Sequence, residues 1–238
     1  MTQDPTRAVL GRPRQRVVPP NSQRFGLVIG IDVYRDERLN LRCAAADARS
    51  IYDLMIDPAC GLFPKENVHL LLNEQATTAQ IWGALADLRK KAIREADIVW
   101  IFYAGHAAPE EDSVYWVTHD ADIDDLYKTA LDRDRIAEVI SKLRAEVVLL
   151  LLDCCYAAAT AARKYPTRSV LSGKALFDAY KGSGRITFAA SNGKQKSVEL
   201  PEVGHGAFTY FLAKGLRGEA DADGDGVVSA DELWMFLQ

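Results

Sequence analysis

The sequence contains few cysteines and no long hydrophobic run. Four cysteines occur in 238 residues, and two of them, Cys154 and Cys155, are adjacent, a spacing that suits neither ordinary structural disulfides nor a zinc site. The first twenty residues lack the apolar core of a signal peptide, and no apolar run approaches the length of a membrane span. We therefore expect a cytoplasmic protein in a reducing environment, with no membrane as a partner.

Positively charged residues are fewer than negatively charged ones. The 29 Lys and Arg residues are outnumbered by 33 Asp and Glu residues, which gives a formal net charge of -4 and argues against nucleic acid as a partner. No Gly-rich phosphate loop follows the first predicted strand, which weakens the alternative of a nucleotide-binding or response-regulator domain. A hydrophobic fraction of 48% is ordinary for a globular protein, and this length permits a sizeable core.

The order of predicted elements indicates the fold class. Residues 1–23 show little periodicity and are expected to form a flexible leader. Hydrophobic patterns predict strands at residues 25–32, 68–72, 97–103, 114–117, 146–152 and 185–190, and helices at 41–55, 77–96, 134–143, 157–162 and 207–216. Strands that alternate with helices predict an α/β fold, with an open, mostly parallel sheet covered by helices on both faces.

Polar residues follow several of the predicted strands. In such sheets, ligands bind outside the carboxyl ends of the strands, where we place Asp32, His106 and the group Asp153-Cys154-Cys155. A thiol has a pKa of ~8.5, so it is mostly protonated at neutral pH. A neighbouring imidazole can accept its proton and later protonate a leaving amine. The other histidines, His69, His119 and His205, are expected in structural, loop or capping roles.

These residues carry a resemblance to a known family. His106 precedes Cys155 by 49 positions, and the caspase spacing is about 50. Residues 103–106, Tyr-Ala-Gly-His, resemble the Y-S-G-H segment of metacaspases and prokaryotic caspase-like peptidases. Residues 153–155, Asp-Cys-Cys, resemble their D-x-C segment, whose third residue is the nucleophile. The likeness covers about residues 24–238. It includes residues 46–48, Ala-Asp-Ala, in which Asp47 resembles the acidic residue of the family's N-D-A segment, and the small-subunit region at 189–192 and 206–210.

The resemblance implies a cysteine endopeptidase with a caspase-like fold and His106 and Cys155 as its catalytic pair. The backbone amides of Ala107 and Cys155 would form an oxyanion hole. In metacaspase-like enzymes, acidic residues bind an Arg or Lys at P1, the substrate residue before the cleaved bond. Asp47 and Asp153 match those positions. Because Ala104, Ala107 and residues 156–158 depart from the usual pattern, a non-catalytic, Ca²⁺-responsive interaction module remains the alternative.

The resemblance also implies a division of the chain and a mode of activation. We expect a large portion at about residues 24–162, a connecting loop at 163–173 and a small portion at about 174–218. The loop contains Arg163, Lys164 and Arg168, residue types that the expected pocket accepts. We therefore expect cleavage of this loop, by the enzyme itself or by an activating protease, and protein substrates with basic P1 residues as partners.

A second motif lies in residues 219–238. Residues 221–232 fit the EF-hand loop at each defining position, with a sharp turn at Gly226. Oxygen donors suit Ca²⁺, so we expect Ca²⁺ at this loop, with the start of an exit helix behind it. The alternative is a structural connector that binds metal weakly or not at all. The expected metal ligands are Asp221, Asp223, Asp225, Val227, Ser229 and Glu232.

Overall fold

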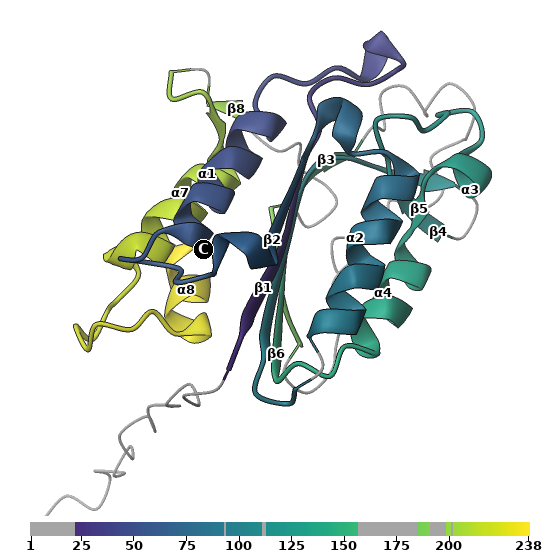
Figure 1. The fold of residues 1–238 in the computed structure, drawn as a ribbon. Coiled ribbons are helices and arrows are strands. Elements are labelled where there is room, and N and C mark those ends of the chain that lie inside the picture. Colours follow the sequence, from purple (N-terminus) through teal and green to yellow (C-terminus); the bar gives the residue numbers. More distant parts are fainter. Residues whose placement is uncertain (1–21, 93, 111–112, 157–184, 191–198, 201) are drawn as a thin grey trace, which may run out of the picture.

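A central sheet of seven strands organises the molecule (Figure 1). The computed structural model describes residues 22–238 apart from 93, 111–112, 157–184, 191–198 and 201. The strands of the sheet are β1 (Arg24–Gly30), β2 (Val68–Leu72), β3 (Ile98–Glu110), β4 (Ser113–Trp116), β5 (Leu131–Asp132), β6 (Val147–Tyr156) and β7 (Arg185–Ala189). A separate two-stranded sheet pairs β8 (Glu199–Leu200) with β9 (His205–Gly206).

The strands are mostly parallel. β2, β1, β3, β6 and β7 lie side by side in that order, and each neighbouring pair is parallel. β4 is antiparallel to β3 and β5 is antiparallel to β4. β1 pairs with β3 only as far as Ala104, and beyond it Ala107 pairs with Trp116 of β4 on one side and Tyr156 of β6 on the other. β4 therefore takes the place of β1 along the last part of β3.

Helices cover both faces of the sheet, as the sequence predicted. Figure 1 shows α1 (Ala44–Ile56), α7 (Ala207–Lys214) and α8 (Ala230–Phe236) on one face, and α2 (Thr78–Lys91) and α4 (Arg133–Ser141) on the other. Shorter elements are the helix α3 (Leu126–Thr129), the 3₁₀ turns η1 (Glu37–Leu39), η2 (Lys65–Asn67) and η3 (Asn73–Gln75), and the π-helical turn η4 (Gly215–Glu219). No helix in the described part of the chain has the length and apolar content needed to cross a membrane.

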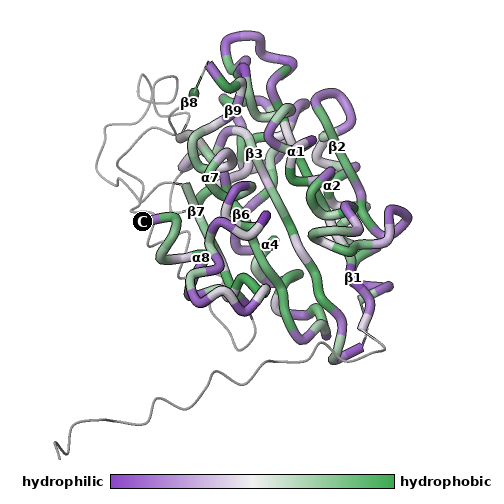
Figure 2. The backbone as a smooth tube through the Cα atoms, turned by 90° about the vertical axis from the view of Figure 1, so that its left-hand side faces the viewer, coloured by the Kyte–Doolittle hydropathy of each residue, from purple (hydrophilic) through white to green (hydrophobic). Residues whose placement is uncertain are grey.

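The core has two layers because successive strand residues face opposite sides of the sheet. In β1, Leu27 and Ile29 pack toward α2 and α4, whereas Val28 packs toward α1 and α7. Figure 2 shows hydrophobic residues running along the sheet, for example in β6 and β7. The nearly continuous apolar runs that predicted buried strands therefore reflect a sheet covered on both faces.

Two strands extend further than the sequence indicated. β3 continues to Glu110, so Gly105 and His106 lie inside this strand and not beyond its end. β6 continues to Tyr156 and includes residues 153–155. Both extensions arise because the two strands stay paired with each other up to Ala107 and Tyr156. In addition, α2 ends at Lys91, five residues earlier than predicted, and α3 and β5 were not predicted.

Candidate active site

The register of β3 and β6 brings the predicted catalytic pair together. His106 and Cys155 are directly paired positions of the two parallel strands, although the sequence separates them by 49 positions. Adjacent strands lie about 4.8 Å apart, so the backbones of these two residues are direct neighbours. The position of Cys155 is known from its backbone within β6.

The ring of His106 is oriented by a backbone carbonyl. Its Nε2 lies 2.9 Å from the carbonyl oxygen of Leu39, which ends η1 and is itself buried. A carbonyl only accepts hydrogen bonds, so Nε2 must carry a proton. In the neutral imidazole, Nδ1 is then the nitrogen with the lone pair. Nδ1 is shielded from solvent, and it is the atom that can accept a proton from a thiol.

Two buried tyrosines hold the backbone of His106. The amide N–H of His106 donates to the hydroxyl of Tyr34 over 2.9 Å, and the Tyr34 ring also packs against the imidazole with ring centroids 5.3 Å apart. The hydroxyl of Tyr103 lies 2.6 Å from the carbonyl oxygen of His106 and 3.0 Å from that of Val117. Burial raises the pKa of both tyrosines above the usual value, so both hydroxyls remain protonated.

Cys154 and Ala107 are both buried. Cys154 belongs to the hydrophobic layer beneath α2 and α4, with 5% of its surface exposed. Buried thiols in apolar surroundings commonly serve as small packing residues. The assignment of Cys154 as the spacer before Cys155 stays a prediction. Ala107 is fully buried and paired on both sides within β3. The assignment of the Ala107 and Cys155 amides to an oxyanion hole stays a prediction.

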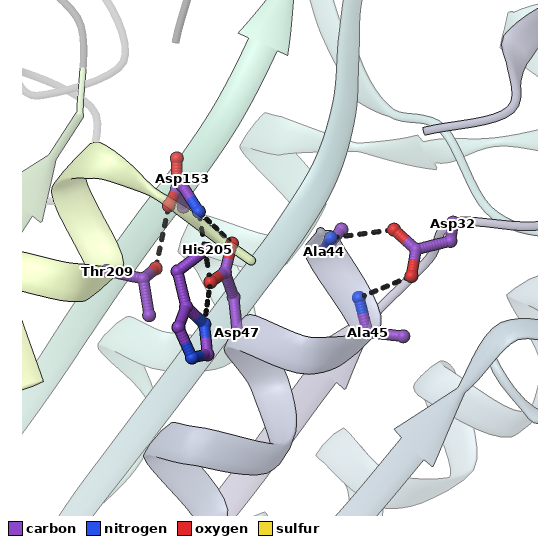
Figure 3. A network of polar contacts seen from close by, with 8 residues as sticks. Asp32, Ala44, Ala45, Asp47, Asp153, His205 and Thr209 are labelled. Carbon is purple, nitrogen blue, oxygen red and sulfur yellow. Dashed lines mark hydrogen bonds and ion pairs between the residues drawn. The ribbon is translucent and has the colours of Figure 1, made fainter. Parts of the chain in front are cut away.

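The two predicted substrate-binding carboxylates lie together. Asp47 of α1 is 3% exposed and Asp153 of β6 is 6% exposed (Figure 3). Both flank Gly206, since a Cβ added there would lie 2.9 Å from Oδ2 of Asp153 and 3.0 Å from Oδ2 of Asp47. The hydroxyl of Thr209 donates to Oδ2 of Asp153 over 2.7 Å. Asp153 is two positions before Cys155 in β6, which places this acidic cluster next to the predicted nucleophile.

His205 is a member of this cluster that the sequence did not reveal. Its Nδ1 lies 2.8 Å from Oδ1 of Asp47, and the amide of Gly206 donates to both oxygens of the same carboxylate. Burial raises the pKa of Asp47 to about 7, and the neighbouring Asp153 carboxylate adds to the rise. The bonds from His205 and Gly206 oppose it. Two effects on the pKa of Asp47 thus oppose each other: burial favours its neutral form, and the hydrogen-bond donors favour its charged form.

Asp32, which follows β1, positions the helix that carries Asp47. Its two carboxylate oxygens accept hydrogen bonds from the amides of Ala44 at 2.6 Å and Ala45 at 3.0 Å (Figure 3). These amides belong to the first turn of α1, where backbone donors have no partner within the helix. The residue directly before the helix, Cys43, makes no side-chain cap. Asp32 therefore has a structural role as a cap supplied from a distance.

The predicted Ca²⁺ loop is exposed and rich in carboxylates. Oxygens of Asp221, Asp223 and Asp225 lie within 4.8 Å of one another, and Gly226 adopts the left-handed conformation of a sharp turn with φ of 84°. The carboxylate of Glu232 reaches back to the same loop, because it accepts hydrogen bonds from the amide of Ala222, which lies between Asp221 and Asp223, and from the amide of Ser229. The role of Glu232 at position 12 stays a prediction.

Several residues fall outside these results or were missed. The predicted processing residues Arg163, Lys164 and Arg168 and the helix predicted at 157–162 lie outside the described residues.

The sequence did not indicate four residues that contact the predicted site residues, namely Tyr34, Leu39, Thr209 and His205. Each of these contacts joins segments that are distant in the sequence. His205 bonds a residue 158 positions away. The one local signal was its place before the segment 206–210, which we had matched to the small-subunit region.

Comparison with known proteins identifies the family. The caspase domain family matches residues 23–231, so the chain belongs to this family. A protein of a Desulfuromonadales bacterium, named as a probable protease, is 26% identical over 255 aligned residues, which include 91% of this chain and 29% of that protein. The chain thus spans under a third of that relative's length. The solved structure of protein GSU0716 from Geobacter sulfurreducens shares the fold, with a TM-score of 0.60, 18% identity and 83% coverage of both chains.

Proposed function

We propose that the protein is a cysteine endopeptidase that cleaves after Arg or Lys. The observation that carries this proposal is the direct pairing of His106 with Cys155 across β3 and β6, beside two buried carboxylates. The caspase family of the chain and the probable protease to which it is similar support a peptidase. The oriented imidazole supports the use of a thiol nucleophile.

In the proposed reaction, Nδ1 of His106 accepts the proton of the Cys155 thiol. The thiolate then attacks the carbonyl carbon of the scissile bond, and the carbonyl oxygen becomes an oxyanion beside the Ala107 and Cys155 amides. Collapse of this intermediate expels the amine, which takes a proton from His106 and leaves an acyl-enzyme. Water, deprotonated by His106, hydrolyses the thioester and restores the thiol.

The preference for a basic P1 residue rests on Asp47 and Asp153. A guanidinium or ammonium group placed between their carboxylates would make charge-assisted hydrogen bonds in a region largely closed to water. The absence of a side chain at Gly206 lets its backbone lie close to both carboxylates, since a Cβ there would come within 3.0 Å of both. Animal caspases, which accept an acidic P1 residue, would need the opposite charge at this position.

Two further parts of the proposal concern control of activity. We propose that Ca²⁺ binds the 221–232 loop, supported by the convergence of Asp221, Asp223 and Asp225. We also propose that cleavage after Arg163, Lys164 or Arg168 activates the enzyme. A cut that mass spectrometry detects in the wild type, but not in Cys155→Ala, would support processing by the enzyme itself.

Peptides ending in Arg, Lys or Asp before a fluorogenic group test the catalytic and specificity assignments. We expect the wild type to release the fluorophore from the Arg and Lys peptides and Cys155→Ala and His106→Ala to release none. Cys154→Ala is the matched control and should keep most of the activity because Cys154 lies in the buried hydrophobic layer beneath α2 and α4. A dead Cys154→Ala beside an active Cys155→Ala would reverse the nucleophile assignment, and a preference for Asp would refute the acidic pocket.

A further inference from the structure

His205 is bonded to the carboxylate of Asp47, the same group that would bind a basic substrate side chain in the proposed pocket. Its imidazole bonds Oδ1 of Asp47 over 2.8 Å, and its side chain is 28% exposed whereas that of Asp47 is 4% exposed. His205 is therefore the partly exposed partner of a buried carboxylate, and it can exchange protons with solvent. Since the acceptor is a carboxylate, Nδ1 carries a proton when Asp47 is ionised, and Nε2 is the nitrogen that can gain or lose one.

The elements around His205 present mainly negative charge. α1 contributes Asp47 and β6 contributes Asp153, the two carboxylates that flank Gly206. In the register of the β8–β9 pair, His205 is paired with the apolar Leu200, and the next position, Gly206, is paired with Glu199. α7 contributes the neutral hydroxyl of Thr209, which is already bonded to Asp153. A proton on His205 would thus place a positive charge in direct contact with an acidic site.

A protonated His205 and a basic P1 side chain would compete for the same negative charge. With Asp47 and Asp153 ionised, the pocket and a neutral His205 carry two negative charges, and protonation of His205 reduces this to one. The imidazolium also keeps its hydrogen bond to Oδ1 of Asp47, an oxygen that accepts a second hydrogen bond from the amide of Gly206. Both effects weaken the attraction of the pocket for an incoming cation.

We propose that His205 is a specificity-determining residue that sets, through its own protonation, how strongly the pocket binds a basic P1 side chain. This inference rests on the proposed function. The pocket binds Arg or Lys strongly when His205 is neutral and weakly when it is protonated. Binding of basic substrates therefore strengthens as His205 loses its proton. Because the pKa of Asp47 is raised to about 7, ionisation of Asp47 acts in the same direction, and variants compared at pH 8, where Asp47 is mostly ionised, isolate the contribution of His205. Because coupling between two sites is reciprocal, a bound cation must lower the affinity of His205 for its proton by the same factor.

The reciprocal effect can be measured without turnover. Benzamidine, a soluble amidinium, serves as the probe, and the Cε1–H resonances of the full isotope-labelled chain are followed by NMR from pH 5 to 9. The His205 resonance is assigned as the one lost in His205→Gln. With saturating benzamidine, we expect its titration midpoint to fall by about one pH unit, which corresponds to about tenfold weaker binding to the protonated form. His119, a half-buried histidine bonded to the carbonyl of Val33, is the internal control and should not shift.

Two variants give an independent measurement. At pH 8, His205→Arg keeps a positive charge against Asp47, whereas His205→Gln keeps a hydrogen-bond donor without charge. We expect His205→Arg to bind benzamidine about tenfold more weakly than His205→Gln, and His205→Gln to bind it as the wild type does. A pair of variants with equal affinity would overturn the inference.

The outcomes separate this inference from the proposed function. If the wild type cleaves Arg peptides and benzamidine competes with them, but the His205 titration does not move, the inference is wrong and the proposed function stands. If Arg peptides are not cleaved and benzamidine does not bind at any pH, the acidic pocket itself is refuted, and the inference falls with it.

Discussion

At the scale of single residues, His106 is held through its backbone as well as its ring. Nε2 meets the carbonyl of Leu39, the amide meets Tyr34, and the carbonyl meets Tyr103. Each of these partners is buried. A catalytic base needs a fixed position relative to its nucleophile, and such buried partners supply it. The tyrosines are therefore positioning residues for the proposed reaction.

Tyr34→Phe should separate positioning from proton transfer. The change removes the acceptor of the His106 amide and leaves a buried donor unsatisfied, at a cost of about 1–3 kcal/mol. We expect kcat for an Arg peptide to fall at least several-fold, with KM nearly unchanged because Tyr34 is not part of the acidic cluster. Tyr127→Phe is a matched control, since Tyr127 is 77% exposed. Equal kcat for both variants would show that Tyr34 does not position His106.

The raised pKa of Asp47 predicts a dependence of stability on pH. A carboxyl whose pKa rises from 3.8 to about 7 on folding stabilises the fold most below pH 4, and this stability is lost as the pH rises through 7. Asp47→Asn cannot ionise, so it should unfold at a higher temperature than the wild type at pH 8, by a few degrees. The difference should shrink at pH 4. Thermal unfolding at both pH values checks this, and a larger difference at pH 4 would contradict it.

The sequence indicated some of these residues and not others. His106, Cys155, Asp47 and Asp153 were recognisable because each lies in a short segment that resembles a family motif. His205 gave no such signal, because its role depends on a carboxylate that lies far away in the sequence and close in the fold. Contacts that arise from strand order and helix packing are set by the whole chain and leave no local pattern.

At the scale of elements, the lengths of β3 and β6 were the main error of prediction. Hydrophobic runs ended near Tyr103 and Leu152, and we ended both strands there. Each strand continues because the other provides hydrogen-bond partners up to Ala107 and Tyr156. Polar residues such as Asp153 can lie inside a strand where neighbouring elements satisfy them, here through Thr209. The fold class was accessible from the sequence, whereas the strand ends depended on pairing.

The start of α1 offers a test at this scale. Asp32→Ala removes both acceptors of the Ala44 and Ala45 amides and should destabilise the protein by about 1–2 kcal/mol. Asp32→Asn keeps one acceptor oxygen and should lose less. Asp36→Ala is the control, because Asp36 caps only the short exposed turn η1. Chemical denaturation measures the three free energies of unfolding, and an Asp32→Ala loss no larger than that of Asp36→Ala would exclude the capping role.

At the scale of the whole molecule, the C-terminal segment is packed onto the domain. Leu233 of α8 is buried in the same hydrophobic layer as Leu212 of α7. A Cβ added at Gly215 would lie 2.9 Å from Leu233 and 3.0 Å from Phe236, so the π-helical turn and α8 are in close contact. The ring of Trp234 lies 6.1 Å from that of Phe188 in β7. Because α8 packs on the core, binding that stabilises the 221–232 loop should also stabilise the folded domain against unfolding.

Ca²⁺ should raise the unfolding temperature of the wild type, and Mg²⁺ should do so much less, because its smaller ion demands stricter geometry. Glu232→Gln should lose most of the Ca²⁺ effect. Asp231→Asn, at loop position 11, is the matched control and should keep it, since that position supplies no ligand. The comparison uses the shift caused by Ca²⁺ within each variant, because Glu232 also caps α8. Equal shifts in wild type and Glu232→Gln would place any Ca²⁺ effect elsewhere.

The two faces of the sheet draw on different lengths of chain, and this has a consequence for synthesis. Among the residues that the structure describes, the buried members of the layer beneath α2 and α4 fall between Phe25 and Cys154, and Ala189 of β7 packs against them. The opposite layer also needs Leu212 and Leu233. Because chains emerge from the ribosome N-terminus first, one face of the sheet can be covered before α7 and α8, which cover the other face, have been synthesised. A nascent chain that has reached Tyr156 therefore holds every fully buried residue described for one face, whereas the apolar surface of the other face, on α1 and the strands below it, still requires protection.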